Sequence, residues 1–217
     1  LWIPFTIAAA FFQNLRSALQ KHLKSRLSTA GAAYVRFFYA WPFAVVYVWG
    51  LARFGGFDVP AVNPTFLMYC FLGGLSQIIF TFLLIWLFSF RNFAVGTTYS
   101  KTETVQVALL GFLILGDSLS LWAGVAIAVS LIGVLALSVA QTKVTAANLI
   151  TSLGEKPTII GLICGAFLGA SVVFFRGGAL TLDGDDFIMR AAFTLAVSVI
   201  MQTVMMGAYL LLREPGQ

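Results

Sequence analysis

The sequence predicts an all-α fold, a polytopic bundle of transmembrane helices, and three observations lead to it. Of the 217 residues, 60% are apolar and only 10% are charged, whereas a soluble domain has about 45–50% apolar and about 25% charged residues. The apolar residues gather in runs near the length of about 20 residues that a membrane span needs. Residues that break helices separate these runs. With so little polar surface, most of the chain must face lipid.

Seven runs qualify as spans. They cover residues 2–20, 32–51, 66–90, 93–115, 121–140, 159–175 and 187–212. Gly55, Gly56 and Pro60, followed by Asn63 and Pro64, separate the second run from the third. Glycine and proline at these positions favour a loop.

Carboxylates are expected to begin two of these helices. Asp117 and Ser118 separate the fourth run from the fifth and have the chemistry of an N-cap for the fifth helix. Asp183, Asp185 and Asp186 precede the seventh run, where negative charge favours a helix N-terminus. We expect these aspartates to cap helices rather than to form a catalytic pair.

The sixth run carries a stripe of small residues. Gly161, Gly165 and Gly169 form a G-x-x-x-G-x-x-x-G pattern, which places three glycines on one helix face and lets a neighbouring helix approach closely. The neighbour is either another helix of this chain or a second copy in a homodimer. Both alternatives account for the pattern.

An internal repeat is indicated by two similar helix starts. Arg36 lies near the start of the second run and Arg190 near the start of the seventh, each in a segment rich in small residues. If the first and sixth runs correspond, residues 1–140 form one repeat of five helices and 141–158 a linker. Residues 159–217 are then the first two helices of a second repeat, so we expect the chain to be a fragment of a longer protein.

The fourth run carries the main candidate site. Tyr99, Glu103 and Gln106 share one face of a continuous helix, and an ionisable residue within a membrane is a functional candidate. Lys101 is two residues from Glu103 and therefore lies on another face. Glu103 would bind substrate or a coupling proton, or it would form a structural ion pair with Lys101, Arg16 or Arg36.

Other polar residues are candidates for the same cavity. The first run has a polar face that includes Gln13 and Arg16, with Asn14 beside it; this is either a cavity wall or the point where the span ends. Gln77 would add an amide to the cavity. Trp86 would supply an aromatic wall or an anchor at the membrane interface.

Signs of an enzyme or of a cofactor are missing from the sequence. The single histidine, His22, lies in a basic stretch away from other ligand types, so neither a zinc site nor a histidine-dependent triad is expected. Cys70 and Cys164 lie in apolar runs and favour buried thiols. The net charge of +5 is spread between runs, which favours contact with membrane lipid over binding of nucleic acid. We expect no cofactor.

One region resembles a known family. Residues 113–120 read L-I-L-G-D-S-L-S, and Trp122, Gly124 and Gly133 follow. This order resembles the signature that joins the last two helices of a repeat in the drug/metabolite transporter superfamily, EamA type. That family usually has glutamate where this chain has Asp117. Arg36 and Phe37 are also similar to the family's arginine–phenylalanine pair.

The resemblance implies a secondary active transporter. Family members have ten helices in two inverted repeats with a cavity between the repeats, and they export amino acids, other metabolites or drugs by alternating access. The implied partners are a small-molecule substrate and a coupling proton, and the implied location is the plasma membrane, such as the bacterial inner membrane. A channel, a scaffold subunit without transport activity and a membrane-embedded enzyme are the alternatives.

Overall fold

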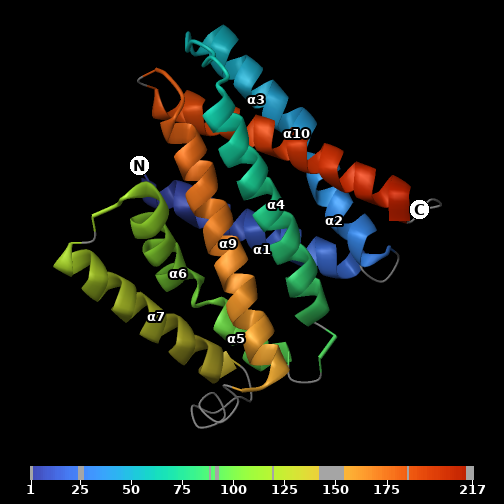
Figure 1. Ribbon diagram of the computed structural model, residues 1–217, viewed down its shortest axis with the longest axis vertical. Helices are drawn as coiled ribbons and strands as arrows, with labels where there is room; N and C mark the ends of the chain where they lie inside the picture. The colour runs from blue at the N-terminus through green and yellow to red at the C-terminus, as the bar shows by residue number, and fades with distance from the viewer. Residues whose placement is uncertain are drawn as a thin grey trace.

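The computed structural model is all α-helical, and it describes residues 2–23, 27–87, 89–90, 93–118, 120–141, 154–184 and 186–213. Its elements follow one another along the chain as shown in Figure 1. They are α1 (Trp2–Leu23), α2 (Thr29–Phe38), α3 (Ala40–Phe54), α4 (Pro64–Leu87), α5 (Phe93–Ser100), α6 (Glu103–Leu110), the π-helical turn η1 (Gly111–Leu115), α7 (Leu121–Gln141), α9 (Lys156–Leu180) and α10 (Phe187–Arg213).

Within the described residues, four helical segments are long and apolar enough to cross a membrane. They are Ala33–Phe54, Pro64–Leu87, Lys156–Leu180 and Phe187–Arg213. These segments correspond to the second, third, sixth and seventh runs of the sequence. The chain is therefore an all-α protein with the features of a multi-pass membrane protein. The first and fifth runs are helical, as α1 and α7, and their crossing of the membrane stays a prediction.

The fourth run is not one continuous helix, so the assumption of a single regular helix over 93–115 is wrong, while its crossing of the membrane stays a prediction. The helix stops at Ser100 and restarts at Glu103. Between them the backbone tightens, because Lys101 and Thr102 donate to the carbonyl oxygens three residues back, at 3.1 Å each. The Thr102 hydroxyl also donates to the Tyr99 carbonyl oxygen at 2.7 Å. A side chain that bonds to the backbone in this way competes with the regular helical ladder.

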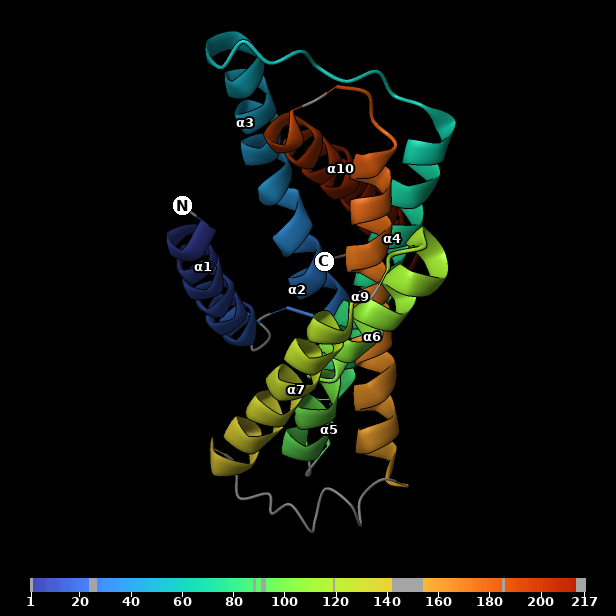
Figure 2. The same cartoon turned by 90° about the vertical axis from the view of Figure 1, so that its left-hand side faces the viewer.

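The centre of the molecule is the pair α4 and α9, which run side by side through the bundle (Figure 1). The broken helix α5–α6 packs on α9, while α10 packs on α2, α3 and α4. From the side, α1 and α7 lie at the periphery (Figure 2). The segment predicted as a second repeat thus packs directly on the first, and the repeat boundaries themselves stay a prediction.

Two short polar contacts fix the ends of α4 and α9 against each other. The Asn63 side chain accepts from the Phe66 N–H at 2.7 Å, which caps α4. The same side chain donates to the Thr181 carbonyl oxygen at the end of α9 at 2.8 Å. Asn63 therefore satisfies backbone groups that both helix ends would leave unpaired.

The cap of α7 differs from the expectation. Asp117 and Ser118 were the expected caps, but the Ser120 hydroxyl accepts from the Ala123 N–H at 3.1 Å. Asp117 instead faces α9, where it binds Arg176. Gly116 has a φ of 70°, a left-handed conformation that ends η1 and turns the chain so that Asp117 lies beside Gly111.

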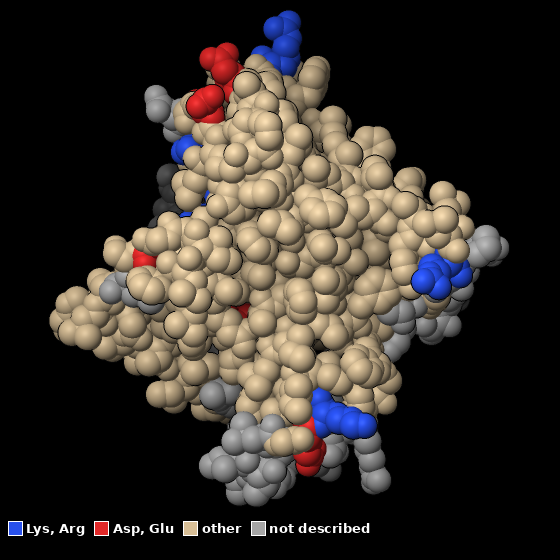
Figure 3. Space-filling model, viewed as in Figure 1, with Lys and Arg blue, Asp and Glu red and all other residues tan. Residues whose placement is uncertain are grey.

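The surface agrees with a lipid environment. In Figure 3 the broad middle of the visible face is uncharged apart from one small red spot, and the charged groups lie near its margins. Many large apolar side chains are exposed, among them Phe43 at 77% and Trp122 at 80%. A patch of this extent on a soluble monomer would be a liability, whereas lipid tails accept it.

Candidate functional site

A cavity of about 550 Å³ lies between α4, α9 and α10. Its wall consists of one residue of α4, four of α9 and eight of α10. They are Gln77, Phe175, Arg176, Ala179, Leu180, Phe187, Arg190, Ala191, Thr194, Leu195, Ser198, Val199 and Gln202. This size is within the range of small-molecule sites.

Small residues on α4 make room for this wall. A Cβ atom on Gly73 would lie 2.6 Å from the ring of Phe175, and one on Gly74 would lie 3.2 Å from the Gln202 side chain. Both distances are shorter than normal van der Waals contact. The Gly73–Gly74 pair therefore lets Phe175 of α9 and Gln202 of α10 pack directly on the α4 backbone.

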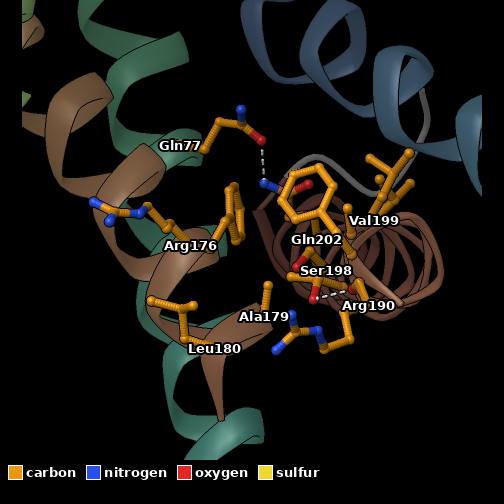
Figure 4. Close-up of a pocket in the computed structure, with 13 residues that line it drawn as sticks. Gln77, Arg176, Ala179, Leu180, Arg190, Ser198, Val199 and Gln202 are labelled. Atoms are coloured by element: carbon orange, nitrogen blue, oxygen red, sulfur yellow. Dashed lines mark hydrogen bonds between the residues drawn. The ribbon is translucent and has the colours of Figure 1, made fainter. Parts of the chain in front are cut away.

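A pair of amides closes one end of the cavity. The Gln202 amide nitrogen donates to the Gln77 side-chain oxygen at 2.6 Å (Figure 4). It also donates to the Gly74 carbonyl oxygen at 3.4 Å. Gln202 is only 1% exposed. Burying an amide without partners is costly, so this network holds α10 in register with α4.

A polar stripe runs along α10 from the other end of the cavity to the amide pair. Its members are spaced four residues apart and lie on one helix face: Arg190, Thr194, Ser198 and Gln202. The Thr194 hydroxyl donates to the Arg190 carbonyl oxygen at 2.7 Å. The Ser198 hydroxyl is buried, and the Cys70 thiol of α4 lies beside it.

Two arginines line the cavity, but their surroundings differ. Arg176 donates through both terminal nitrogens to the two carboxylate oxygens of Asp117, one of these bonds measuring 3.0 Å. In Figure 4 its side chain extends away from Gln202 and Arg190. The Nε atom of Arg190 is buried and has no partner among the described residues. The cavity therefore contains one guanidinium group whose charge no described carboxylate balances within 4.0 Å.

The residues of the predicted site lie in several places. Gln77 lines the cavity. Tyr99, Lys101, Glu103 and Gln106 lie around the break between α5 and α6, where Lys101 is exposed and Glu103 is half-buried. Trp86 is 54% exposed and its ring lies 5.7 Å from that of Phe90. The side chains of three predicted residues fall outside the described ones: Gln13, Asn14 and Arg16.

The break between α5 and α6 forms a second polar region, against the glycine face of α9. The Gln106 amide nitrogen donates to the Thr102 hydroxyl at 3.1 Å and to the Leu162 carbonyl oxygen at 3.3 Å. A Cβ atom on Gly165 would lie 2.9 Å from the Ser100 carbonyl oxygen and 3.1 Å from the Gln106 side-chain oxygen. Glu103 follows the break directly and begins α6.

The three glycines of α9 therefore have a neighbour within this chain. Gly161 lies against the backbone of Gly96 and Gly169 against Val107. Contacts of this kind within the chain account for the glycine pattern. A homodimer through the same face would have to displace α5 and α6.

Sequence reasoning missed most of the cavity wall. The four-residue spacing of polar residues along the seventh run is visible in the sequence and was the available signal. Phe175, Arg176 and Leu180 carry no such signal, because they become neighbours of α10 only when the chain between α9 and α10 turns back. Comparisons with protein-family models, with curated proteins and with solved structures find no match to this chain.

Proposed function

We propose that this chain belongs to a secondary active transporter of the EamA type, which moves small polar solutes across the plasma membrane by alternating access. The observation that carries the proposal is the cavity between α4, α9 and α10, which combines an amide pair, hydroxyls and an arginine with apolar walls. Polar groups within apolar helices are costly and typically mark a substrate or ion pathway.

The broken helix gives further support. Discontinuous helices that pack against a neighbouring helix are a recurring feature of transporter binding sites. The break at Lys101 and Thr102 lies against α9, and α9 also contributes Phe175 and Arg176 to the cavity. Glu103 at the start of α6 is the proposed coupling residue, so one helix would connect the substrate site with the coupling site.

The experiment is comparative profiling of extracellular metabolites from bacteria that express the unmutated protein, Gln202→Leu or Glu103→Gln at matched membrane levels. We expect one class of solute to accumulate outside cells with the unmutated protein and to return to the background level with either variant. Thr203→Val is a control for the first variant, because the Thr203 hydroxyl donates to its own helix at Val199 and lies outside the cavity wall. Glu155→Gln, at the exposed start of α9, is the control for the second.

The alternatives give different results. A channel would give a flux that does not saturate with solute concentration. A scaffold subunit would leave every extracellular pool unchanged, and that outcome would overturn the proposal. Unchanged accumulation with Glu103→Gln would remove Glu103 from the mechanism while leaving the transporter proposal in place.

A further inference from the structure

The cavity between α4, α9 and α10 has an electrostatic asymmetry that indicates the class of its ligand. At one end Arg190 lies in the first turn of α10. Asp183 and Asp186 precede this turn and offset the partial positive charge of the helix start, but among the described residues neither forms a salt bridge with Arg190. Its Nε atom is buried and has no partner among the described residues. Figure 4 shows Arg190 on the cavity wall, to which Ala179 of α9 also belongs.

The second arginine does not add to this charge. Arg176 binds both carboxylate oxygens of Asp117, and a pair of this kind is neutral as a unit. The bidentate arrangement also orients the Arg176 guanidinium toward Asp117 and away from Arg190 (Figure 4). The described wall of the cavity therefore has a net charge of about one positive unit, located at Arg190.

Between Arg190 and the amide pair the wall combines apolar side chains with the hydroxyls of Thr194 and Ser198. Of the apolar side chains, Phe175 and Leu180 come from α9, and Leu195 and Val199 come from α10. Arg190 and Gln202 are twelve residues apart on one helix, which is about 18 Å along the axis. The cavity thus has a cationic end, a middle of apolar side chains beside a stripe of two hydroxyls, and an end with amide groups.

We infer that this cavity binds an organic monoanion with an apolar body, whose anionic group pairs with Arg190 and whose body lies among Phe175, Leu180 and Leu195. One guanidinium without a salt bridge among the described residues matches one negative charge, such as a carboxylate or sulfonate, better than a dianionic phosphate. The apolar side chains of the wall disfavour small inorganic anions, which would lose their hydration without filling the cavity. The inference names a substrate class for the proposed transporter. Binding of the anion does not depend on transport, and only the role of the anion as a substrate rests on the proposed function.

The source of the anion is either a free solute or the headgroup of an anionic lipid, since both present the same chemistry. The test uses the purified protein in nanodiscs of phosphatidylcholine, which has no net charge. The probe is naphthylacetate, and its neutral counterpart of nearly the same shape is naphthylacetamide. Binding is measured by equilibrium titration with radiolabelled probe.

We expect the acid to bind at least about tenfold more tightly than the amide, the difference expected for a charge-assisted pair. Arg190→Gln should weaken binding of the acid by about tenfold and leave binding of the amide within about twofold. Arg190→Lys should retain part of the preference, because it keeps the charge and loses the planar fork. Arg53→Gln removes an exposed arginine of α3 outside the cavity wall and should change neither affinity.

Equal binding of acid and amide would overturn the inference, and so would an equal loss with Arg53→Gln and Arg190→Gln. A matched melting temperature for the two glutamine variants shows that a loss of binding is not a loss of fold. Replacing a minor fraction of the lipid with phosphatidylglycerol separates the two sources. If phosphatidylglycerol displaces naphthylacetate, the site binds a lipid headgroup. If the affinity for naphthylacetate is unchanged, the site binds a free organic anion.

The inference and the transporter proposal fail in different ways. Binding of the acid without flux in proteoliposomes would remove transport and retain the anion site. Saturable flux of a neutral solute, with no preference for acid over amide, would retain transport and remove the anion site.

Discussion

Gly161 of α9 and Gly96 of α5 lie in backbone contact: a Cβ atom on Gly161 would overlap the Gly96 carbonyl oxygen. Backbone atoms cannot move aside as a flexible side chain can. Gly161→Ala must therefore separate α9 from α5 or distort one of them. We expect a loss of stability of about 1–3 kcal/mol, the usual cost of overpacking, measured by unfolding in detergent.

The control for this substitution is Gly133→Ala on α7. A Cβ atom there would meet nothing within 4 Å, and alanine is the better helix former by about 1 kcal/mol in water. Gly133→Ala should therefore be neutral or stabilising. Equal losses for both variants would mean that Gly161 and Gly96 are not in contact in the protein.

The hydrogen bond between Gln77 and Gln202 should contribute measurably to the stability of the protein. Gln202→Leu leaves the partly buried Gln77 side chain without its 2.6 Å hydrogen bond. Because a fully buried orphaned group costs about 1–3 kcal/mol, we expect a loss toward the lower end of that range. The double variant Gln77→Leu with Gln202→Leu removes both polar groups and should recover most of that loss. A double-mutant cycle on thermal unfolding measures the recovery, and strictly additive losses would contradict the contact.

The pair Asp117–Arg176 should contribute little to stability despite its bidentate geometry. The side chains of Arg176 and Asp117 are 56% and 30% exposed, and exposed pairs are typically worth about 0.2–1 kcal/mol. We expect a coupling energy in that range from the cycle of Asp117→Asn and Arg176→Gln. A much larger coupling would mean that lipid or further protein screens the pair from water.

Ser118 and Ser120 both precede α7, and the structure shows that Ser120 is the residue that caps it. Ser120→Ala should destabilise the protein by about 1 kcal/mol, because the Ser120 hydroxyl accepts from the Ala123 N–H. Ser118→Ala should stay within about 0.5 kcal/mol, as is usual for surface substitutions. The measurement is the midpoint of unfolding for both variants, and the reverse order would restore the cap expected from the sequence.

The broken helix shows why periodicity alone was insufficient for the candidate site. Tyr99, Glu103 and Gln106 share a face only on an unbroken helix, and nothing in the apolar pattern of 93–115 indicates a break. The break accompanies the Thr102 hydroxyl bond to Tyr99 and the contact of Ser100 with Gly165. Ser100 and Gly165 are 65 residues apart in the sequence, so the residues near the break do not predict this contact.

The amino-acid sequence by itself determined the helical class, the apolar surface and the approximate bounds of the four long spans, because these depend on composition and run length, which are local properties. The glycine stripe of α9 also indicated a close neighbour. Only the tertiary structure decided which neighbour, which carboxylate Arg176 binds, and where the cavity lies. Each of these depends on contacts between distant segments, whose geometry follows from how α4, α9 and α10 cross.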